Sequence, residues 1–165
     1  MRIMNNLPEN IEKNSSNVSK NILVHAPPEL CFSHIKKQLD SPDDWDRLVL
    51  HAWPVSADRS QKGAVSQVLF NLAGNVILSR AIIHRYQPDC CLSWFLAVSP
   101  RTWVTWHLSR VSQINTTVKI TIGREKASPW IDKFWWRLWF QNKLKRDLNQ
   151  TLIQFKHTIE KTYKM

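Results

Sequence analysis

The spacing of hydrophobic and polar positions changes several times along this chain, and each change predicts an element of secondary structure. Residues 21–25 alternate and predict a short strand. Pro28 follows closely, and because proline favours the first turn of a helix, we expect a helix to begin there. Ser41 and Pro42 repeat this signal, since serine caps a helix and proline suits its first position. Two short helices in a row are therefore predicted.

From His51 onward the hydrophobic positions recur with a period of two, which is typical of half-buried strands. The sequence Ala73-Gly74-Asn75 predicts a hairpin turn, and further turn residues divide the rest of the region. Short strands separated in this way favour a meandering antiparallel sheet. Six strands are expected, around Val55 and over 65–72, 76–86, 90–98, 102–111 and 116–123.

The last part of the chain predicts one long helix, over residues 129–163. Ser128 is suited to cap it, and Pro129 to its first position. The order strand, two short helices, six strands and long helix (β-α-α-β6-α) makes the chain an α+β protein. A one-sided hydrophobic stripe, the pattern of a helix that lies on a sheet, runs along the last helix at Leu144, Leu148, Leu152, Phe155 and Ile159.

Several stretches give this order a resemblance to a known superfamily. "NILVHAPPELCF" is similar to its opening strand and first helix, "DDWDRLV" to its second short helix, and "IIHRYQPDCCLSW" to its strand-turn-strand with a central proline. Gly63 matches a common glycine before the third strand. The chain from about residue 19 to 163 thus resembles the helix-grip fold of START, polyketide cyclase/dehydrase and coenzyme-Q-binding proteins, the SRPBCC superfamily. The end of the last helix matches at Leu148, Leu152, Phe155 and Glu160.

The resemblance implies a curved antiparallel sheet wrapped around the long C-terminal helix, with an elongated apolar cavity between them. In such proteins the cavity holds lipids, sterols, polyketides or quinones, and some members are enzymes while many only bind and deliver. No catalytic motif is common to the superfamily, so none is transferred here. One departure is Asn115-Thr116, where many members have a Gly-Thr turn.

The N-terminal residues 1–18 are polar and rich in Asn and Ser, which predicts a flexible arm before a single helix-grip domain over residues 19–165. The arm lacks the apolar core of a secretion signal. The chain also lacks the run of about 18 apolar residues that a membrane span needs. A cytoplasmic protein is therefore expected, with a peripheral position at the inner face of the membrane as a further expectation from its charge.

The net charge of +10 is distributed unevenly. Residues 1–62 carry no net charge, residues 63–123 carry +4 and residues 124–165 carry +6. A one-sided basic surface attracts anionic lipid headgroups, nucleic acid or acidic ligands. The candidates for contact with an anionic membrane or another anion are Lys133, Arg137, Lys143, Lys145 and Arg146.

The segment 130–140 is apolar except for Asp132, Lys133 and Arg137. A helix that is apolar nearly all round needs cover on more than one side. Packing against the two short helices is the favoured interpretation. Contact with a membrane surface, where tryptophan and phenylalanine settle beside cations, is the second, and self-association as a homodimer is the third. Nucleic acid is not favoured as a partner, because these aromatic residues cluster on a helix instead of lying spaced on an open sheet.

The three cysteines, Cys31, Cys90 and Cys91, are expected to be free structural thiols, since their number is odd and two of them are adjacent. The sequence has no C-x-x-C or H-x-x-x-H spacing, so we expect no metal site and no cofactor. Motifs of serine hydrolases, zinc proteases and phosphate-binding loops are also missing from the sequence. The motifs therefore assign no catalytic residue.

Two histidines are nevertheless candidates for chemistry. His84 and His107 lie in the middle of predicted strands, where one that pointed into the cavity would serve as a general base or a hydrogen-bond anchor. A histidine that faces solvent or is satisfied within the structure is the favoured interpretation for both. Arg80 and Arg85 fall on opposite faces of one predicted strand, and an arginine inside an apolar pocket needs an anionic partner. An arginine that points outward into solvent is the favoured interpretation.

Three hypotheses for the function follow. The first is a non-catalytic carrier of a hydrophobic small molecule or lipid, held between the sheet and the last helix. The second is an enzyme of the polyketide cyclase/dehydrase type that uses His84 or His107. The third is a protein-interaction module whose core is filled by tryptophans. The residues expected to line the cavity are Trp45, Phe70, Ile82, His84, Trp94, Leu96, Trp106, Ile120, Trp135, Leu138 and Trp139.

Overall fold

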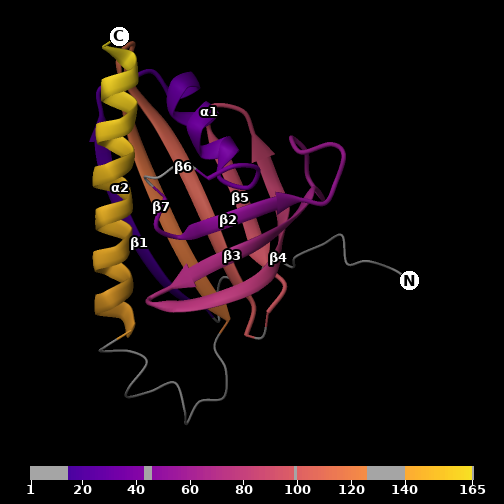
Figure 1. Ribbon diagram of the computed structural model, residues 1–165. Coiled ribbons are helices and arrows are strands. Elements are labelled where there is room, and N and C mark those ends of the chain that lie inside the picture. The colour runs from indigo at the N-terminus through magenta and orange to yellow at the C-terminus, as the bar shows by residue number, and fades with distance from the viewer. Residues whose placement is uncertain (1–14, 43–45, 99, 126–139, 165) are drawn as a thin grey trace.

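A computed structural model of the protein describes residues 15–42, 46–98, 100–125 and 140–164. Within these residues lie seven strands and two helices (Figure 1). Their bounds are β1 Ser15–Val24, α1 Pro28–Lys37, β2 Val49–Pro54, β3 Val65–Leu72, β4 Asn75–Gln87, β5 Cys91–Leu96, β6 Thr102–Ser112, β7 Asn115–Glu125 and α2 Gln141–Tyr163.

The seven strands form one antiparallel sheet in the order β1-β7-β6-β5-β4-β3-β2. Strands β2 to β6 each pair with the next strand along the chain, and β1 pairs with β7. The sheet curls, so that β2 and β3 pass in front of β5 and β6, with α2 along one side (Figure 1). The packing of α2 on the sheet is closest at β1. The predicted α+β helix-grip architecture is confirmed.

The described residues contain one short helix where the sequence predicted two. After α1, the carboxylate of Asp46 accepts hydrogen bonds from the backbone N–H groups of Leu48 and Val49, at 2.8 and 3.1 Å. This turn leads the chain directly into β2, so the described residues on either side of 43–45 are not helical. Residues 43–45 themselves, in the middle of the predicted second helix, lie outside the described part.

Strand β1 begins at Ser15, well before the strand that the sequence predicted. Its first half contains Val18 as its one apolar residue and therefore carries little hydrophobic signal, but its backbone pairs with β7 along the whole length of the strand. The last residues of the predicted arm, 1–18, thus belong to the sheet, while residues 1–14 lie outside the described part. The predicted start of the last helix at Ser128 also lies outside it.

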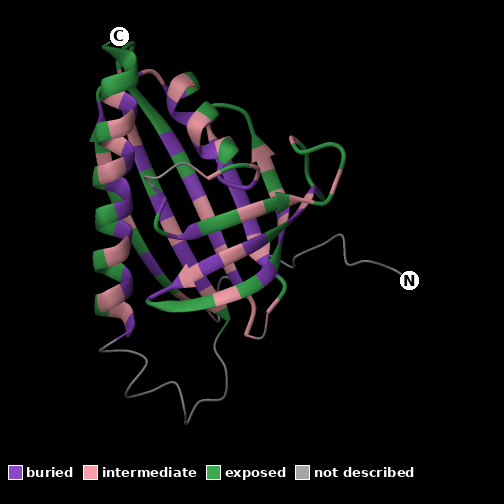
Figure 2. Cartoon of the chain, viewed as in Figure 1, coloured by how far each residue is buried: buried purple, intermediate pink, exposed green. Residues whose placement is uncertain are grey.

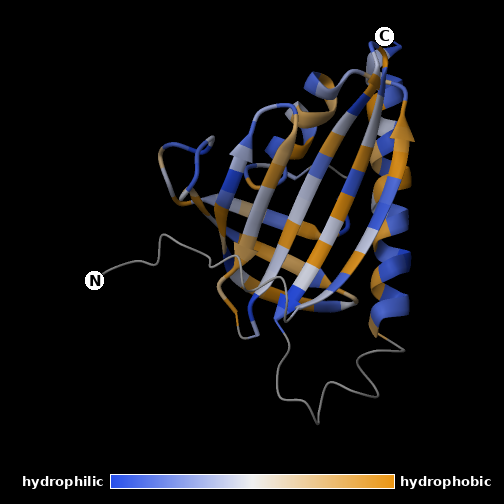
Figure 3. Cartoon of the chain, turned by 180° about the vertical axis from the view of Figure 1, so that it is seen from behind, coloured by the Kyte–Doolittle hydropathy of each residue, from blue (hydrophilic) through white to orange (hydrophobic). Residues whose placement is uncertain are grey.

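The inner face of the sheet and the facing sides of both helices form one hydrophobic core, seen as the purple stretches in Figure 2. The pairing register puts Val18, Ile122, Val104, Trp94 and Ile83 in one row across five strands, and all five side chains are buried. From behind, the strands show alternating hydrophobic and hydrophilic residues (Figure 3). The predicted stripe of the last helix is buried as well, at Leu144, Leu148, Leu152, Phe155 and Ile159.

Candidate functional site

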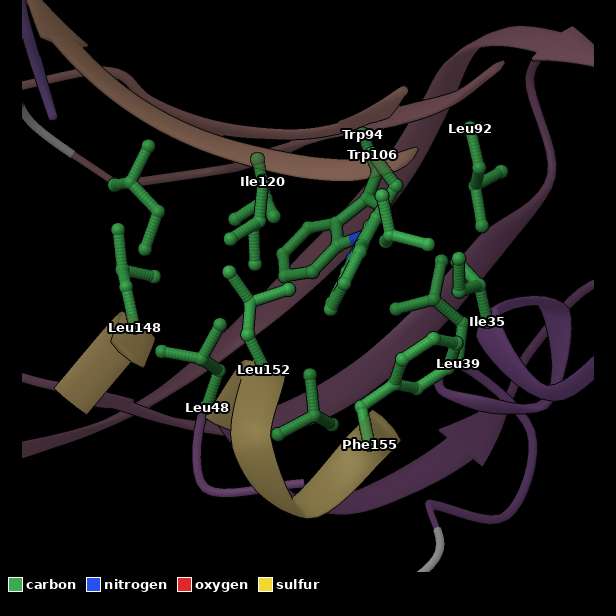
Figure 4. Close-up of a cluster of buried hydrophobic side chains, with 14 of the residues drawn as sticks. Ile35, Leu39, Leu48, Leu92, Trp94, Trp106, Ile120, Leu148, Leu152 and Phe155 are labelled. Carbon is green, nitrogen blue, oxygen red and sulfur yellow. The ribbon is translucent and has the colours of Figure 1, made fainter. Parts of the chain in front are cut away.

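The space between the sheet and α2 is filled by aromatic and aliphatic side chains (Figure 4). Trp94 on β5 and Trp106 on β6 are fully buried diagonal neighbours on the inner face of the sheet. The ring centroid of Trp106 lies 5.8 Å from that of Phe155 on α2. The ring centroid of Trp94 lies 5.6 Å from that of Phe70 on β3, with the two rings perpendicular. Trp106 thus joins the sheet to the helix, and Trp94 joins two strands of the curled sheet.

A single amide side chain, that of Gln38, is fully buried beside these rings. Gln38 is the residue at which α1 ends, three positions after the buried Ile35, so the helical spacing turns it toward the core. Its Oε1 accepts a hydrogen bond of 2.9 Å from the indole Nε1 of Trp106. The end of α1 therefore holds an amide group inside an otherwise apolar interior.

Three buried polar atoms of the core lack a hydrogen-bond partner in the described part of the protein: Nε2 of Gln38, Nε1 of Trp94 and Oγ1 of Thr151. The two nitrogens are N–H donors, and the hydroxyl group can donate or accept. Leaving a buried polar group unpaired costs about 1–3 kcal/mol. The described interior therefore offers two unpaired donor nitrogens to any oxygen atom that enters it.

Gln38 and Thr151 were missed by the sequence analysis, although a signal for both exists. Each is a polar residue at a position where the spacing of its helix requires an apolar one, Gln38 after Ile35 and Thr151 after Leu148. A polar residue at a core position is either paired within the fold or available to a ligand. This pattern would have added both residues to the candidate site.

A small hollow lies at one end of the core, where β7 ends and α2 begins. Its volume is about 10 Å³, which is room for about one water molecule. The described residues therefore leave space here for a water molecule but not for a lipid. The hollow is lined by Ser16, Val18, Leu72, Thr102, Ile122, Arg124, Phe140, Gln141 and Leu144.

The predicted cavity residues fall into three groups. Ile82 is placed on the outer face of the sheet, because it pairs with Phe95, whose neighbours Trp94 and Leu96 face the core. His84 also lies on this outer face, with its ring centroid 6.5 Å from that of Phe95. The remaining described residues do lie in the core: Phe70, Trp94, Leu96, Trp106 and Ile120. Outside the described part are Trp45, Trp135, Leu138 and Trp139.

A β-bulge explains why the faces of β4 differ from the prediction. The pairing of β4 with β5 shifts by one residue between Ile83 and Arg85. Arg80 and Arg85, expected on opposite faces of the strand, are therefore both exposed on the outer face. Neither arginine enters the core, so neither can bind an anion there.

The candidate histidines do not reach the interior either. His84 lies within the bulge of β4. His107 on β6 is exposed on the outer face, opposite Lys119, with its Nδ1 at 3.4 Å from the Oγ of Ser109. Neither histidine points into the cavity, because the alternation of both strands turns them to the outer face, which is the alternative that the sequence favoured. The placement of His84 in the cavity lining is corrected for the same reason.

Three of the cations predicted to contact anions, Lys143, Lys145 and Arg146, lie near the start of α2. Lys145 and Arg146 are exposed. Lys143 is half-buried beside the β3–β4 turn, where a Cβ atom added to Gly74 would overlap its ammonium end. Lys133 and Arg137 lie outside the described residues.

Neither of the described helices is long and apolar enough to cross a membrane.

All three cysteines are free, as predicted. Burial raises the pKa of the Cys31 thiol to about 12, and it also raises the pKa of the Cys91 thiol. Cys90 is half-buried. Among the described residues, no group of three or more His, Cys, Asp or Glu side chains is placed to hold a metal ion.

No protein-family model matches the chain, and no curated protein matches its sequence. Solved structures do match it. TTHA0849 from Thermus thermophilus is 15% identical with a TM-score of 0.68, and the match covers 89% of this chain and 99% of that one. The Zhui aromatase/cyclase from Streptomyces sp. R1128 is 13% identical with a TM-score of 0.67, covering 90% of this chain and 96% of that one.

A START superfamily protein from Mycobacterium smegmatis is 12% identical with a TM-score of 0.62, covering 90% of this chain and 97% of that one. Identities this low show a shared fold and nothing further about activity. The chain therefore has the SRPBCC-type helix-grip fold that its sequence predicted.

Proposed function

We propose that the protein is a non-catalytic carrier, which binds a hydrophobic small molecule or lipid between the sheet and α2. The fold supports the proposal, since a START superfamily protein and an aromatase/cyclase share it. The observation that carries it is the set of unpaired polar atoms on Gln38, Trp94 and Thr151 inside an otherwise apolar core. A core built only for stability has no use for these atoms, because each of them costs free energy when unpaired.

A ligand that carries one oxygen acceptor, such as a carbonyl group, satisfies at least one of these atoms. Its oxygen accepts from Nε1 of Trp94 or Nε2 of Gln38, and each such bond adds a net stabilisation of about 0.5–1.5 kcal/mol. The apolar remainder of the ligand gains about 25 cal/mol for each Å² of apolar surface that it buries. The expected ligand is therefore largely apolar, with at least one hydrogen-bond acceptor.

Such a ligand needs more space than the described core contains. Trp94 is the side chain best suited to give way, because its indole N–H forms no hydrogen bond in the described part that turning the ring would break. Turning Trp106 instead would break its hydrogen bond to Gln38. We therefore expect the Trp94 ring to turn on binding while Trp106 keeps its position.

A cyclase-type enzyme is the alternative that the fold allows. It requires an acid or base within reach of the bound substrate. The two histidine candidates lie on the outer face, and the unpaired polar atoms on Gln38, Trp94 and Thr151 in the described core belong to an amide, an indole and a hydroxyl, none of which titrates near neutral pH. These positions favour a carrier over an enzyme.

A filled core with no ligand is the second alternative, in which the protein acts as an interaction module. The packing of Trp94 and Trp106 in the described core supports it. Only an experiment on the protein from its own cells separates this alternative from a carrier, because a foreign expression host need not contain the natural ligand.

The test is to purify the protein without detergent from its own cells, extract it with organic solvent and analyse the extract by mass spectrometry. The proposal predicts one apolar compound with an oxygen acceptor, in a fixed ratio to the protein. An extract that matches a protein-free control contradicts it. A compound that the purified protein converts to a product of different mass identifies an enzyme instead.

A matched pair of variants locates the site. Trp94→Phe removes the interior N–H donor and keeps an aromatic ring, so affinity for the extracted compound should fall by roughly 2- to 10-fold. Trp53→Phe makes the same change at an exposed position and should have no effect. Equal effects of the two substitutions would place the ligand elsewhere.

A further inference from the structure

The outer face of β2–β4 exposes apolar side chains to solvent. The exposed fraction is 49% for Trp53 on β2 and 59% for Leu78 on β4, and Val76 on β4 is exposed as well. Leu69 on β3 is half-buried and pairs directly with Leu78. We call Trp53, Leu69, Val76 and Leu78 the outer patch. Apolar side chains gathered on one surface mark a contact with a partner.

The outer patch adjoins basic groups. The register puts Trp53, Gln67 and Arg80 in one row across β2, β3 and β4, next to the row of Leu69 and Leu78. Arg80 is exposed and takes part in no ion pair within the described residues. At the turn that joins β3 to β4, the ammonium end of Lys143 lies against Gly74, two residues before Val76.

The described strands that form this surface carry no acidic residue. Strands β2, β3 and β4 contain neither Asp nor Glu, and the first turn of α2 contains none either. The surface is thus apolar and basic at once. Its partner has to accept apolar side chains and carry negative charge, a combination found at the surface of an anionic lipid bilayer.

A second copy of the chain fits this surface less well. In a two-fold symmetric dimer the same patch meets itself, so Arg80 of each copy would approach strands β2–β4, which contain no acidic residue to pair with. The curl of the sheet also makes the outer face convex, and two convex faces bury little area against each other (Figure 1). Single-stranded nucleic acid fits less well too, because bases stack on aromatic rings and most of the patch is aliphatic.

We propose that the outer patch, with Arg80 and Lys143 beside it, docks the protein on the surface of an anionic membrane. Trp53 and Leu78 enter the interfacial layer of the bilayer, and the two cations contact the lipid headgroups. This surface lies on the opposite side of the sheet from the core that holds the proposed ligand. Membrane docking is therefore independent of whether the core holds a ligand.

The experiment measures flotation of the full-length protein with two kinds of vesicle, phosphatidylcholine alone and phosphatidylcholine mixed with phosphatidylserine. We expect binding to the anionic vesicles and little binding to the neutral ones. The double variant Trp53→Ser, Leu78→Ser should weaken binding by roughly tenfold or more, since it removes most of the inserted apolar area. Arg80→Glu should weaken it by roughly fivefold or more.

Matched control variants are available on other surfaces. Val111 and Ile114, at the β6–β7 turn, have exposed fractions of 61% and 53%, so Val111→Ser, Ile114→Ser removes a similar exposed area elsewhere. Lys119→Glu reverses one exposed charge on β7. Both controls should leave binding within twofold of the unmodified protein. Circular dichroism should show that every variant is folded, as expected for substitutions at exposed positions.

Several results would overturn the proposal. One is an equal loss of vesicle binding in the control variants and in the outer-patch variants. Another is a loss of vesicle binding in the double variant Lys145→Glu, Arg146→Glu with no loss in Arg80→Glu. That result would show that α2, and not the outer patch, contacts the membrane. Binding to single-stranded RNA but not to vesicles would identify a nucleic-acid surface. A concentration-dependent dimer that Trp53→Ser, Leu78→Ser dissociates, with no binding to vesicles, would identify a second copy as the occupant.

Discussion

Gln38 is the residue on which the account of the interior depends most. Its Oε1 holds the indole of Trp106 in place, while its Nε2 stays without a partner in the described part of the protein. In a medium of low polarity a hydrogen bond is strong and an unpaired polar group is costly, so such an amide both fixes its neighbour and favours an incoming oxygen. The same argument applies to the indole nitrogen of Trp94. The specificity of the proposed site therefore resides in a few polar atoms, and its affinity in the apolar walls.

The cysteines give a prediction at the residue scale that checks the packing of the core. Burial raises the pKa of the thiols of Cys31 and Cys91, the former to about 12, so near pH 8 both remain neutral thiols, which react slowly. Iodoacetamide should therefore alkylate the half-buried Cys90 first, and Cys31 should react only as the pH approaches its pKa or as the protein unfolds. Peptide mass mapping over time measures this order.

The control for this experiment is the same reaction in urea, where all three thiols should react at similar rates. If Cys31 were alkylated as fast as Cys90 in the folded protein, α1 would not be packed against the sheet as described. The order of reaction thus tests the placement of α1, which also positions Gln38.

At the scale of elements, α2 closes the core with one face and meets solvent with the other. Leu148 is fully buried in the stripe, and Ile153 on the opposite side of the same helix is 52% exposed. Leu148→Ala should lower the free energy of unfolding by about 2–5 kcal/mol, because it leaves a cavity in the core. Ile153→Ala should change it by less than about 0.5 kcal/mol. Urea denaturation followed by circular dichroism measures both, and similar effects of the two substitutions would mean that α2 does not pack on the sheet.

Elements with a clear hydrophobic period could be predicted from the sequence, and elements set by the backbone could not. The alternation of β7 and the stripe of α2 are confirmed because burial alone decides them. The first half of β1 carries little hydrophobic signal, so only its pairing with β7 reveals it. The bulge of β4 puts Arg80 and Arg85 on the same face of the sheet. The spacing of side chains in the sequence does not indicate where a strand contains such an extra residue.

The candidate site was predicted in part for the same reason. Trp94 and Trp106 follow the period of their strands, so the sequence could place them inside. Gln38 and Thr151 are polar residues at core positions of helices. A search for apolar residues at helical spacing does not select them. Whether a large ring fills the interior or leaves it open depends on side-chain rotamers, and the sequence does not encode these in any simple pattern.

At the scale of the whole molecule, one curled sheet presents two surfaces for which different tasks are proposed. Its concave side and α2 enclose the core that contains the unpaired donors. Its convex side carries the outer patch and Arg80. A carrier of apolar molecules needs both surfaces, because its ligand dissolves in membranes and has to be collected from one or delivered to one. The two proposals therefore describe one activity, although each can fail without the other.

A crystal structure of the protein purified without detergent from its own cells tests the central claim most directly. The account predicts an apolar molecule between the sheet and α2, with the Trp94 ring turned and an oxygen of the ligand within about 3.2 Å of Nε1 of Trp94 or Nε2 of Gln38. An interior closed around an unturned Trp94 ring, with both nitrogens paired to a buried water, would contradict the account and identify the core as a filled one.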